Sequence, residues 1–204
     1  MRRWLLCTCL MISVRHAACG AVVTWEEREP VVDSAVTNAL AKVGMHYRSA
    51  VLVDDYVGID LQGTGISSLA ALTNEVVRRA IGGREVSINI AGTSVRDFSP
   101  LSGLSVRHLN LSFMGRISLR SLSGVSVRSL ALVSTEVDDV APAAHVPLGE
   151  IAFNPFTVTN GLQQLMRVPS LARVNNMAAE VFWKRLPVMQ QEVQNHSAKR
   201  TGQP

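Results

Sequence analysis

Residues 101–112 have the sequence LSGLSVRHLNLS, and residues 122–133 have the sequence LSGVSVRSLALV. The second stretch repeats the first after 21 residues and keeps its apolar positions. Near its end each stretch has two apolar residues that flank a single variable one, a pattern that we call the apolar triplet. The triplet occurs at residues 88–90, 109–111, 130–132 and 151–153, always 21 residues apart. A fixed period indicates a chain built from similar units that stack on one another.

A fifth triplet, at residues 59–61, precedes the one at 88–90 by 29 residues instead of 21. The eight extra residues fall within 73–84, TNEVVRRAIGGR, where apolar residues recur at helical spacing. We expect a helix there, with Thr73 as its N-cap and Gly82 at its end.

The triplets predict strands, because apolar residues that alternate with others point to one face of a strand. One triplet is too short to be a stable strand by itself. Stacked in parallel, the triplets can share one hydrogen-bond ladder, and each unit buries its apolar face against its neighbours. We therefore predict an α/β fold with parallel strands stacked about every 21 residues. Equivalent positions that face a dry interior are predicted for Ile88, Leu109, Leu130 and Ile151.

The whole unit can be written apolar-x-x-L-x-L-x-x-T-x-V, which resembles the leucine-rich repeat. The segment DFSPLSGL (97–104) is similar to the back half of the short bacterial variety. Residues 46–69 and 153–186 resemble the entry and exit segments of such modules. This resemblance implies a solenoid with helical caps, whose strands form a concave surface that binds another protein. In one unit Arg116 replaces the expected apolar residue and Ile117 follows one place late, so we expect that unit to turn differently.

Helical segments are expected at both ends of the repeats, because terminal units would otherwise expose apolar surface. In the stretch 31–44, Asp33 or Ser34 can cap a helix and Gly44 can end it. Further helical segments are expected at 161–168 and 178–186, with Phe182 and Trp183 covering the last unit. The predicted organisation is a signal peptide (1–20), an N-terminal cap (21–57), leucine-rich repeats (58–154), a C-terminal cap (155–189) and a flexible tail (190–204).

The N-terminus has the layout of a secretory signal peptide. Arg2 and Arg3 precede an apolar run at residues 4–14, and small residues follow. The run is too short to span a bilayer, which takes about 20 residues. Cys19, at the end of the sequence HAAC, leaves a lipoprotein signal as an alternative, with Cys19 as the lipidated residue. We expect an exported protein of the periplasm, the cell envelope or the extracellular space, with membrane contact only through a lipid on Cys19.

Removal of residues 1–20 would take away all three cysteines and three arginines, which leaves 17 basic residues against 16 acidic ones. This balance gives no reason to expect binding to nucleic acid. Without cysteine, disulfides and thiolate chemistry are excluded from the mature chain. The remaining histidines are isolated in the sequence, and no serine lies in a G-x-S-x-G motif. We expect no enzyme activity, no cofactor and no metal.

A protein partner is expected on the outward side chains of the strands, with the chain itself a monomer. Phe113, directly after a strand, is the aromatic candidate on this surface; the alternative is that its ring folds over the neighbouring turn. A structural or accessory envelope lipoprotein, or an accessory subunit of an envelope enzyme, remains the alternative function. The predicted partner-binding residues are Asp60, Gln62, Asn89, His108, Asn110, Ser112, Phe113, Ser129, Glu150 and Asn154.

Overall fold

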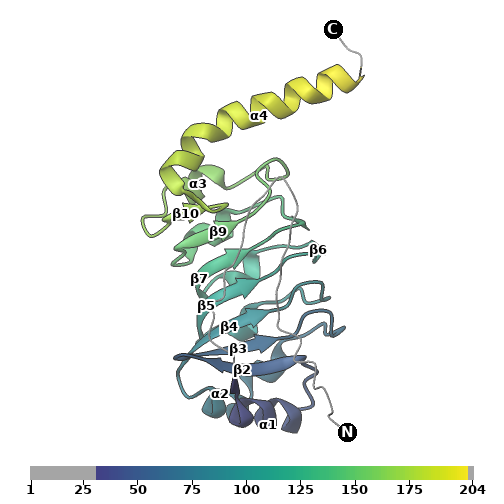
Figure 1. The fold of residues 1–204 in the computed structure, drawn as a ribbon, viewed down its shortest axis with the longest axis vertical. Helices are drawn as coiled ribbons and strands as arrows, with labels where there is room; N and C mark the ends of the chain where they lie inside the picture. The colour runs from purple at the N-terminus through teal and green to yellow at the C-terminus, as the bar shows by residue number, and fades with distance from the viewer. Residues whose placement is uncertain (1–30, 202–204) are drawn as a thin grey trace, which may run out of the picture.

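The computed structural model describes the backbone of residues 31–201 and the side chains of residues 31–193. The predicted signal peptide, the lipidation of Cys19 and the start of the N-terminal cap lie outside the described residues. The chain forms a mixed α/β structure with a nine-stranded, mostly parallel sheet. Its strands follow one another along the long axis, with α1 and α2 at one end and α4 at the other (Figure 1).

The large sheet has the strand order β1-β2-β3-β4-β5-β7-β9-β10-β11, and a second sheet pairs β6 with β8. The strands of the large sheet are β1 (Val31–Val32), β2 (Ser49–Val53), β3 (Tyr56–Asp60), β4 (Glu85–Asn89), β5 (Ser105–Asn110), β7 (Ser126–Ala131), β9 (Glu150–Ala152), β10 (Arg173–Val174) and β11 (Met177–Ala178). The small sheet consists of β6 (Gly115–Arg116) and β8 (Thr135–Glu136). The α-helices are α1 (Ser34–Lys42), α2 (Glu75–Ile81), α3 (Leu162–Met166) and α4 (Ala179–Thr201). The 3₁₀ helices are η1 (Ala70–Thr73), η2 (Ser99–Leu101), η3 (Arg120–Leu122) and η4 (Ala141–His145).

The predicted register of the parallel strands is present. Ile88 of β4 lies opposite Leu109, Leu109 opposite Leu130, and Leu130 opposite Ile151. All four side chains are buried. The ladder also includes Ile59 of the predicted fifth triplet, and it extends beyond the prediction to Val174; both residues are buried. We call these six residues the apolar ladder.

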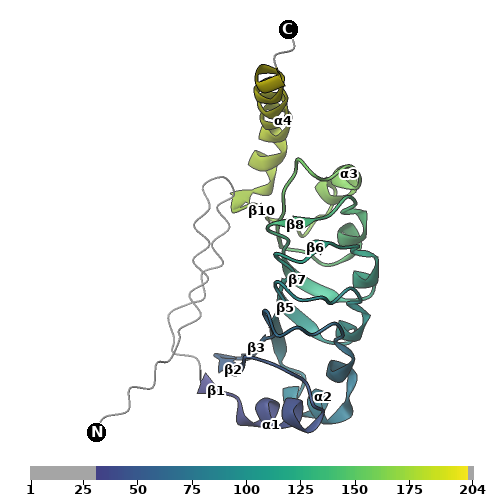
Figure 2. The ribbon, with the colours of Figure 1, turned by 90° about the vertical axis from the view of Figure 1, so that its right-hand side faces the viewer.

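A second layer of apolar side chains lies behind the ladder. Figure 2 shows the sheet on one side of the stack and short helical turns on the other. Each of these turns begins after a buried residue, Phe98 before η2, Leu119 before η3 and Val140 before η4. The short 3₁₀ helix lets each 21-residue unit turn back within a few residues. The core is therefore one continuous cluster that runs through all the units.

The threonine that recurs in the units satisfies a backbone carbonyl at the end of a strand. The Thr64 hydroxyl donates to the Leu61 carbonyl oxygen, and the Thr93 hydroxyl donates to that of Ile90, both at 2.7 Å. In the following unit Met114 occupies the threonine position and has no hydroxyl.

The next unit supplies the missing hydroxyl. Thr135 donates to the Leu111 carbonyl oxygen at 2.7 Å and accepts a bond from the backbone N–H of Met114 at 3.3 Å. Because Thr135 is buried, water cannot easily replace this contact. Two neighbouring units are thus joined by one side chain.

The unit with Arg116 turns differently, as predicted. Arg116 lies in β6 with an exposed side chain, 3.9 Å from a Glu136 carboxylate oxygen and 3.5 Å from one of Asp138. Ile117 fills the interior in its place. The pairing of β6 with β8 compensates locally for the shift by one residue.

The N-terminal end contains two antiparallel strand pairs that the repeats do not predict, β1 with β2 and β2 with β3. β2 and β3 form an antiparallel hairpin, with Ala50 opposite Ile59, so the first strand of the ladder is also half of a hairpin.

Asp33 caps α1, as expected, and accepts bonds from the N–H groups of Ala35 and Val36. The predicted cap of α2 is wrong by one residue: Asn74, not Thr73, accepts the bond from Val76, because Thr73 still belongs to η1.

At the C-terminal end, aromatic rings cover the last units. The centroid of the buried Phe182 ring lies 6.2 Å from that of Phe153 and 5.0 Å from that of Trp183. The β10–β11 hairpin lies between α3 and α4, where the sequence suggested only Pro169 as a break.

Helix α4 continues to Thr201, through the stretch expected to be a flexible tail. After Pro187 this stretch contains mainly residues that favour helix, such as Gln, Glu, Ala, Lys and Arg.

Replacement of a ladder residue tests the interior assignment. Leu130→Ala should lower the free energy of unfolding by about 2–5 kcal/mol, because it removes buried methyl groups and leaves a cavity. Urea unfolding followed by circular dichroism measures this change. Val188→Ala, at an exposed position of α4, is the control and should change the value by less than about 0.5 kcal/mol. A negligible effect of Leu130→Ala would contradict the assignment.

Removal of a threonine hydroxyl should lower the stability of the fold more when the hydroxyl is buried and bonds to another unit, as in Thr135, than when it bonds within its own unit. Thr135→Val keeps the shape of the side chain but leaves the Leu111 carbonyl without its bond, so we expect a loss of about 1–3 kcal/mol. Thr64→Val is the matched control, because Thr64 is half-buried and bonds within its own unit. Thermal unfolding should rank the two variants in this order, and equal losses would argue against the link between units.

Candidate functional site

The candidate site is the front face of the large sheet, which is the face turned away from the apolar ladder. Its side chains lie in three rows across the strands, because the strands are in register. The first row consists of Gly58, Ser87, His108, Ser129, Glu150 and Arg173. The middle row consists of Asp60, Asn89, Asn110, Ala131 and Ala152. The third row, just beyond the strands, consists of Gln62, Ala91, Ser112, Val133 and Asn154.

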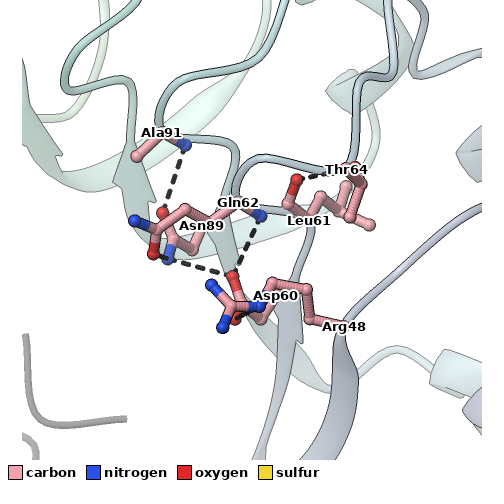
Figure 3. Close-up of polar contacts among 7 residues, drawn as sticks. All are labelled: Arg48, Asp60, Leu61, Gln62, Thr64, Asn89 and Ala91. Carbon is pink, nitrogen blue, oxygen red and sulfur yellow. Dashed lines mark hydrogen bonds and ion pairs between the residues drawn. The ribbon is translucent and has the colours of Figure 1, made fainter.

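Asp60, Asn89 and Gln62 form a hydrogen-bonded cluster on this face (Figure 3). The Asn89 amide nitrogen donates to Asp60 Oδ1 at 3.0 Å and to Gln62 Oε1 at 3.2 Å. The backbone N–H of Gln62 also donates to Asp60 Oδ1, and Arg48 Nε lies 3.8 Å from Oδ2. Asp60 and Asn89 are only 5% and 6% exposed. They face the predicted side, but they bind each other rather than lying open to a partner.

Burial dominates the electrostatics of Asp60. It raises the pKa of the carboxyl group above its usual value, because the charged form loses water. The Gln62 N–H, the Arg48 charge and the Asn89 amide act in the opposite direction but are weaker. The ionised form of Asp60 is therefore less stable in the folded chain than in the unfolded one.

The middle row has a structural role that recurs along the stack. The side-chain oxygen of Asn89 accepts a bond from the Ala91 N–H, and that of Asn110 accepts one from the Ser112 N–H. Asp60 makes the same contact with Gln62. Such bonds from a residue to the N–H two places on form Asx turns, which end the strands. Asp or Asn at the centre of successive triplets is the sequence signal for this role.

The rest of the third row is also tied to the backbone. The Ser112 hydroxyl accepts a bond from the Val133 N–H at 3.2 Å, and Ser112 is buried. Asn154 is exposed and accepts a bond from the Phe156 N–H at 3.0 Å.

A network of ion pairs lies where the central strands begin, and the sequence reasoning missed it. Arg128 Nη2 is 2.8 Å from Glu85 Oε1, and Arg107 Nη1 is 3.9 Å from Glu85 Oε2. Arg107 also lies 3.6 Å from Asp55 and over the Tyr56 ring, 4.8 Å from its centroid. Arginines at equivalent places in SVRH and SVRS are the signal that could have found it. Because these two positive and two negative charges pair with one another, they give the front face no net charge.

His108 lies in the first row between Ser87 and Ser129. Burial lowers its pKa, the positive charges of Arg107 and Arg128 lower it further, and Glu85 acts in the opposite direction. The neutral form of the imidazole is therefore favoured over the charged form. Ser129 is half-buried and Glu150 is exposed, with a carboxylate oxygen 3.7 Å from Arg173 Nε. Within residues 31–193, no three His, Cys, Asp or Glu side chains gather into a group that could hold a metal ion.

The front face changes character toward β9. Ala131, Val133 and Ala152 replace the polar residues of the first units and are half-buried. Phe113 lies at the edge of this region and is 50% exposed. The predicted site residues thus fall into an internally bonded polar cluster near β3 and β4 and a small, partly apolar surface near β7 and β9.

Comparisons with protein-family models, with curated proteins and with solved structures found no match to this chain. Among the helices that the structure describes, none combines the length and the apolar character needed to cross a bilayer.

The raised pKa of Asp60 predicts a specific pH dependence. Its contribution to stability is present below the unfolded-state pKa, near 3.9, and is lost as the pH rises through the higher folded-state pKa. Asp60→Asn keeps a side-chain oxygen for Gln62 and carries no charge. Relative to the unmodified chain, this variant should gain stability as the pH increases from about 4 to 8.

Asp97→Asn provides a control of opposite sign. Bonds from the N–H and the hydroxyl of Ser99 lower the pKa of the exposed Asp97, so its ionised form favours folding. The Asn variant should lose stability relative to the unmodified chain as the pH rises to the unfolded-state value near 3.9, and the difference should change little above about pH 5. Melting temperatures at several pH values measure both differences, and a pH-independent Asp60→Asn difference would refute the assignment.

Proposed function

We propose that the chain is a leucine-rich-repeat solenoid with helical caps that binds a protein partner through its front face, the concave surface of the solenoid. The proposal includes export to the periplasm, the cell envelope or the extracellular space, a monomeric chain, and no catalytic activity. The observation that carries it is the register of the apolar ladder, which turns a repeat in the sequence into a continuous surface made of one strand per unit.

The chemistry of the front face supports binding rather than a reaction. Its polar groups near β3 and β4 bond to one another, and the charged groups where the strands begin form ion pairs. Burial favours the neutral form of His108, which lies between two serines in the first row. A surface of small side chains at regular spacing suits an extended contact with another polypeptide.

A bulky charge in the middle row should disrupt partner binding without unfolding the chain. Ala131→Arg places a long cation in the centre of the front face, at a half-buried position whose side chain makes no hydrogen bond. Ser123→Arg is the matched control, because Ser123 is exposed at the end of η3, on the opposite side of the unit.

Both variants should unfold at temperatures close to that of the unmodified chain. Affinity capture from the envelope of the native organism should recover a defined protein partner with the unmodified chain and with Ser123→Arg, but not with Ala131→Arg. Mass analysis of the mature N-terminus in the same preparation tests export. Equal recovery with Ala131→Arg would exclude the front face as the binding surface.

A further inference from the structure

The turn after β5 holds an aromatic residue in a backbone conformation that normally belongs to glycine. Phe113 has φ = 58°, in the left-handed region. The N–H groups of Gly63, Gly92 and Phe113 each donate to a carbonyl of the next unit, so the three residues occupy equivalent places. The two glycines have φ values of 63° and 65°, and Ser134 in the following unit has 54°.

Phenylalanine is a costly choice at this place. A bulky side chain at positive φ is strained, whereas glycine adopts the same conformation without a steric penalty. The Phe113 ring is 50% exposed, so burial does not fully compensate for the strain. In this turn two other units have glycine and one has the small residue Ser134, so a strained, exposed aromatic residue here indicates a role outside the folded chain.

A second exposed aromatic residue lies along the same edge of the sheet. Phe156, in the turn after β9, is 47% exposed. β5 and β9 are separated by β7 alone, so the two turns lie roughly 10 Å apart at the usual strand spacing. Between them the front face carries Val133, Ala131 and Ala152, all uncharged.

We propose that Phe113 and Phe156, with these small apolar residues between them, form a docking site for a short, uncharged, apolar segment of a partner protein. This inference rests on the proposed function and assigns the partner's contact to one edge of the front face. A charged segment would lose water there without an opposite charge to pair with, because the ionic groups that follow the turns after β5 and β7, Arg116, Glu136 and Asp138, already pair with one another.

The small area of this site favours a short segment over a second copy of the chain. Each half-exposed ring offers roughly 100 Å², about half of what an aromatic side chain can bury. Together with the small residues, this is well below the about 800 Å² per partner of a stable protein interface. Two rings at the edge of a shallow surface suit a few consecutive side chains in extended conformation.

The test uses the full chain and a displayed library of random 12-residue peptides as the probe. Selection should enrich peptides with neighbouring apolar residues and no charge among them. Phe113→Gly should weaken the selected peptides about tenfold or more, as expected for an aromatic anchor. Phe156→Ser should weaken them as well. Ser134→Gly, which makes the same backbone change without removing a ring, should leave binding unchanged.

Stability measurements separate an anchor from a structural residue. If Phe113 serves a partner, Phe113→Gly should melt at the same temperature as the unmodified chain or higher, as should Ser134→Gly. A clear drop in the melting temperature of Phe113→Gly would show that the ring stabilises the fold, and would overturn the proposal.

Four other outcomes would overturn it too. The first is that the selected peptides bind Phe113→Gly with full affinity, and the second is that selection yields no binders or binders without an apolar preference. The third is that the chain associates with itself and that Phe113→Gly abolishes this association. The fourth is that the enriched peptides match an apolar stretch of this chain. Light scattering detects the self-association. If capture of a native partner depends on Ala131 but not on Phe113, only this inference fails; if capture depends on neither, the proposed function fails.

Discussion

The structure depends on the side-by-side burial of one apolar residue from each unit along the ladder from Ile59 to Val174. A single triplet buries too little surface to be stable, so each unit requires a neighbour of the same shape. This requirement fixes the 21-residue spacing, because any change in length must be absorbed without moving the ladder residue. It also aligns every other position, which is why the front face consists of straight rows.

Where one unit departs from the common pattern, an adjacent unit compensates. Thr135 supplies the hydroxyl that Met114 lacks, and β8 pairs with the shifted strand that contains Arg116. Asn89 binds the carboxylate of Asp60 across the strand boundary. Each position that departs from the repeat is therefore compensated by a contact with the next unit. The stability of one unit depends on its neighbours as well as on its own residues.

The sequence predicts the ladder and the buried positions behind it, because both follow a fixed period. It predicts β3 through the triplet at 59–61, but it predicts neither the antiparallel partner β2 nor β10, since these two strands lie outside the repeat. Alternation correctly gives the face to which Asp60 and Asn89 point, but not their burial. That depends on Arg48, which lies just before β2, and on Gln62, which lies in the turn after β3. The positive φ of Phe113 also escapes prediction, because its sequence neighbours carry no turn signal other than Gly115.

The hydrogen bond from the Thr135 hydroxyl to the Leu111 carbonyl oxygen has a consequence for how such a chain can gain or lose units. A gene that gains or loses single units normally produces interchangeable blocks, and any junction between blocks is acceptable. Here, excision of the block that contains Thr135 would leave the Leu111 oxygen without its donor. Separation of this pair of blocks therefore requires a threonine to be restored at position 114.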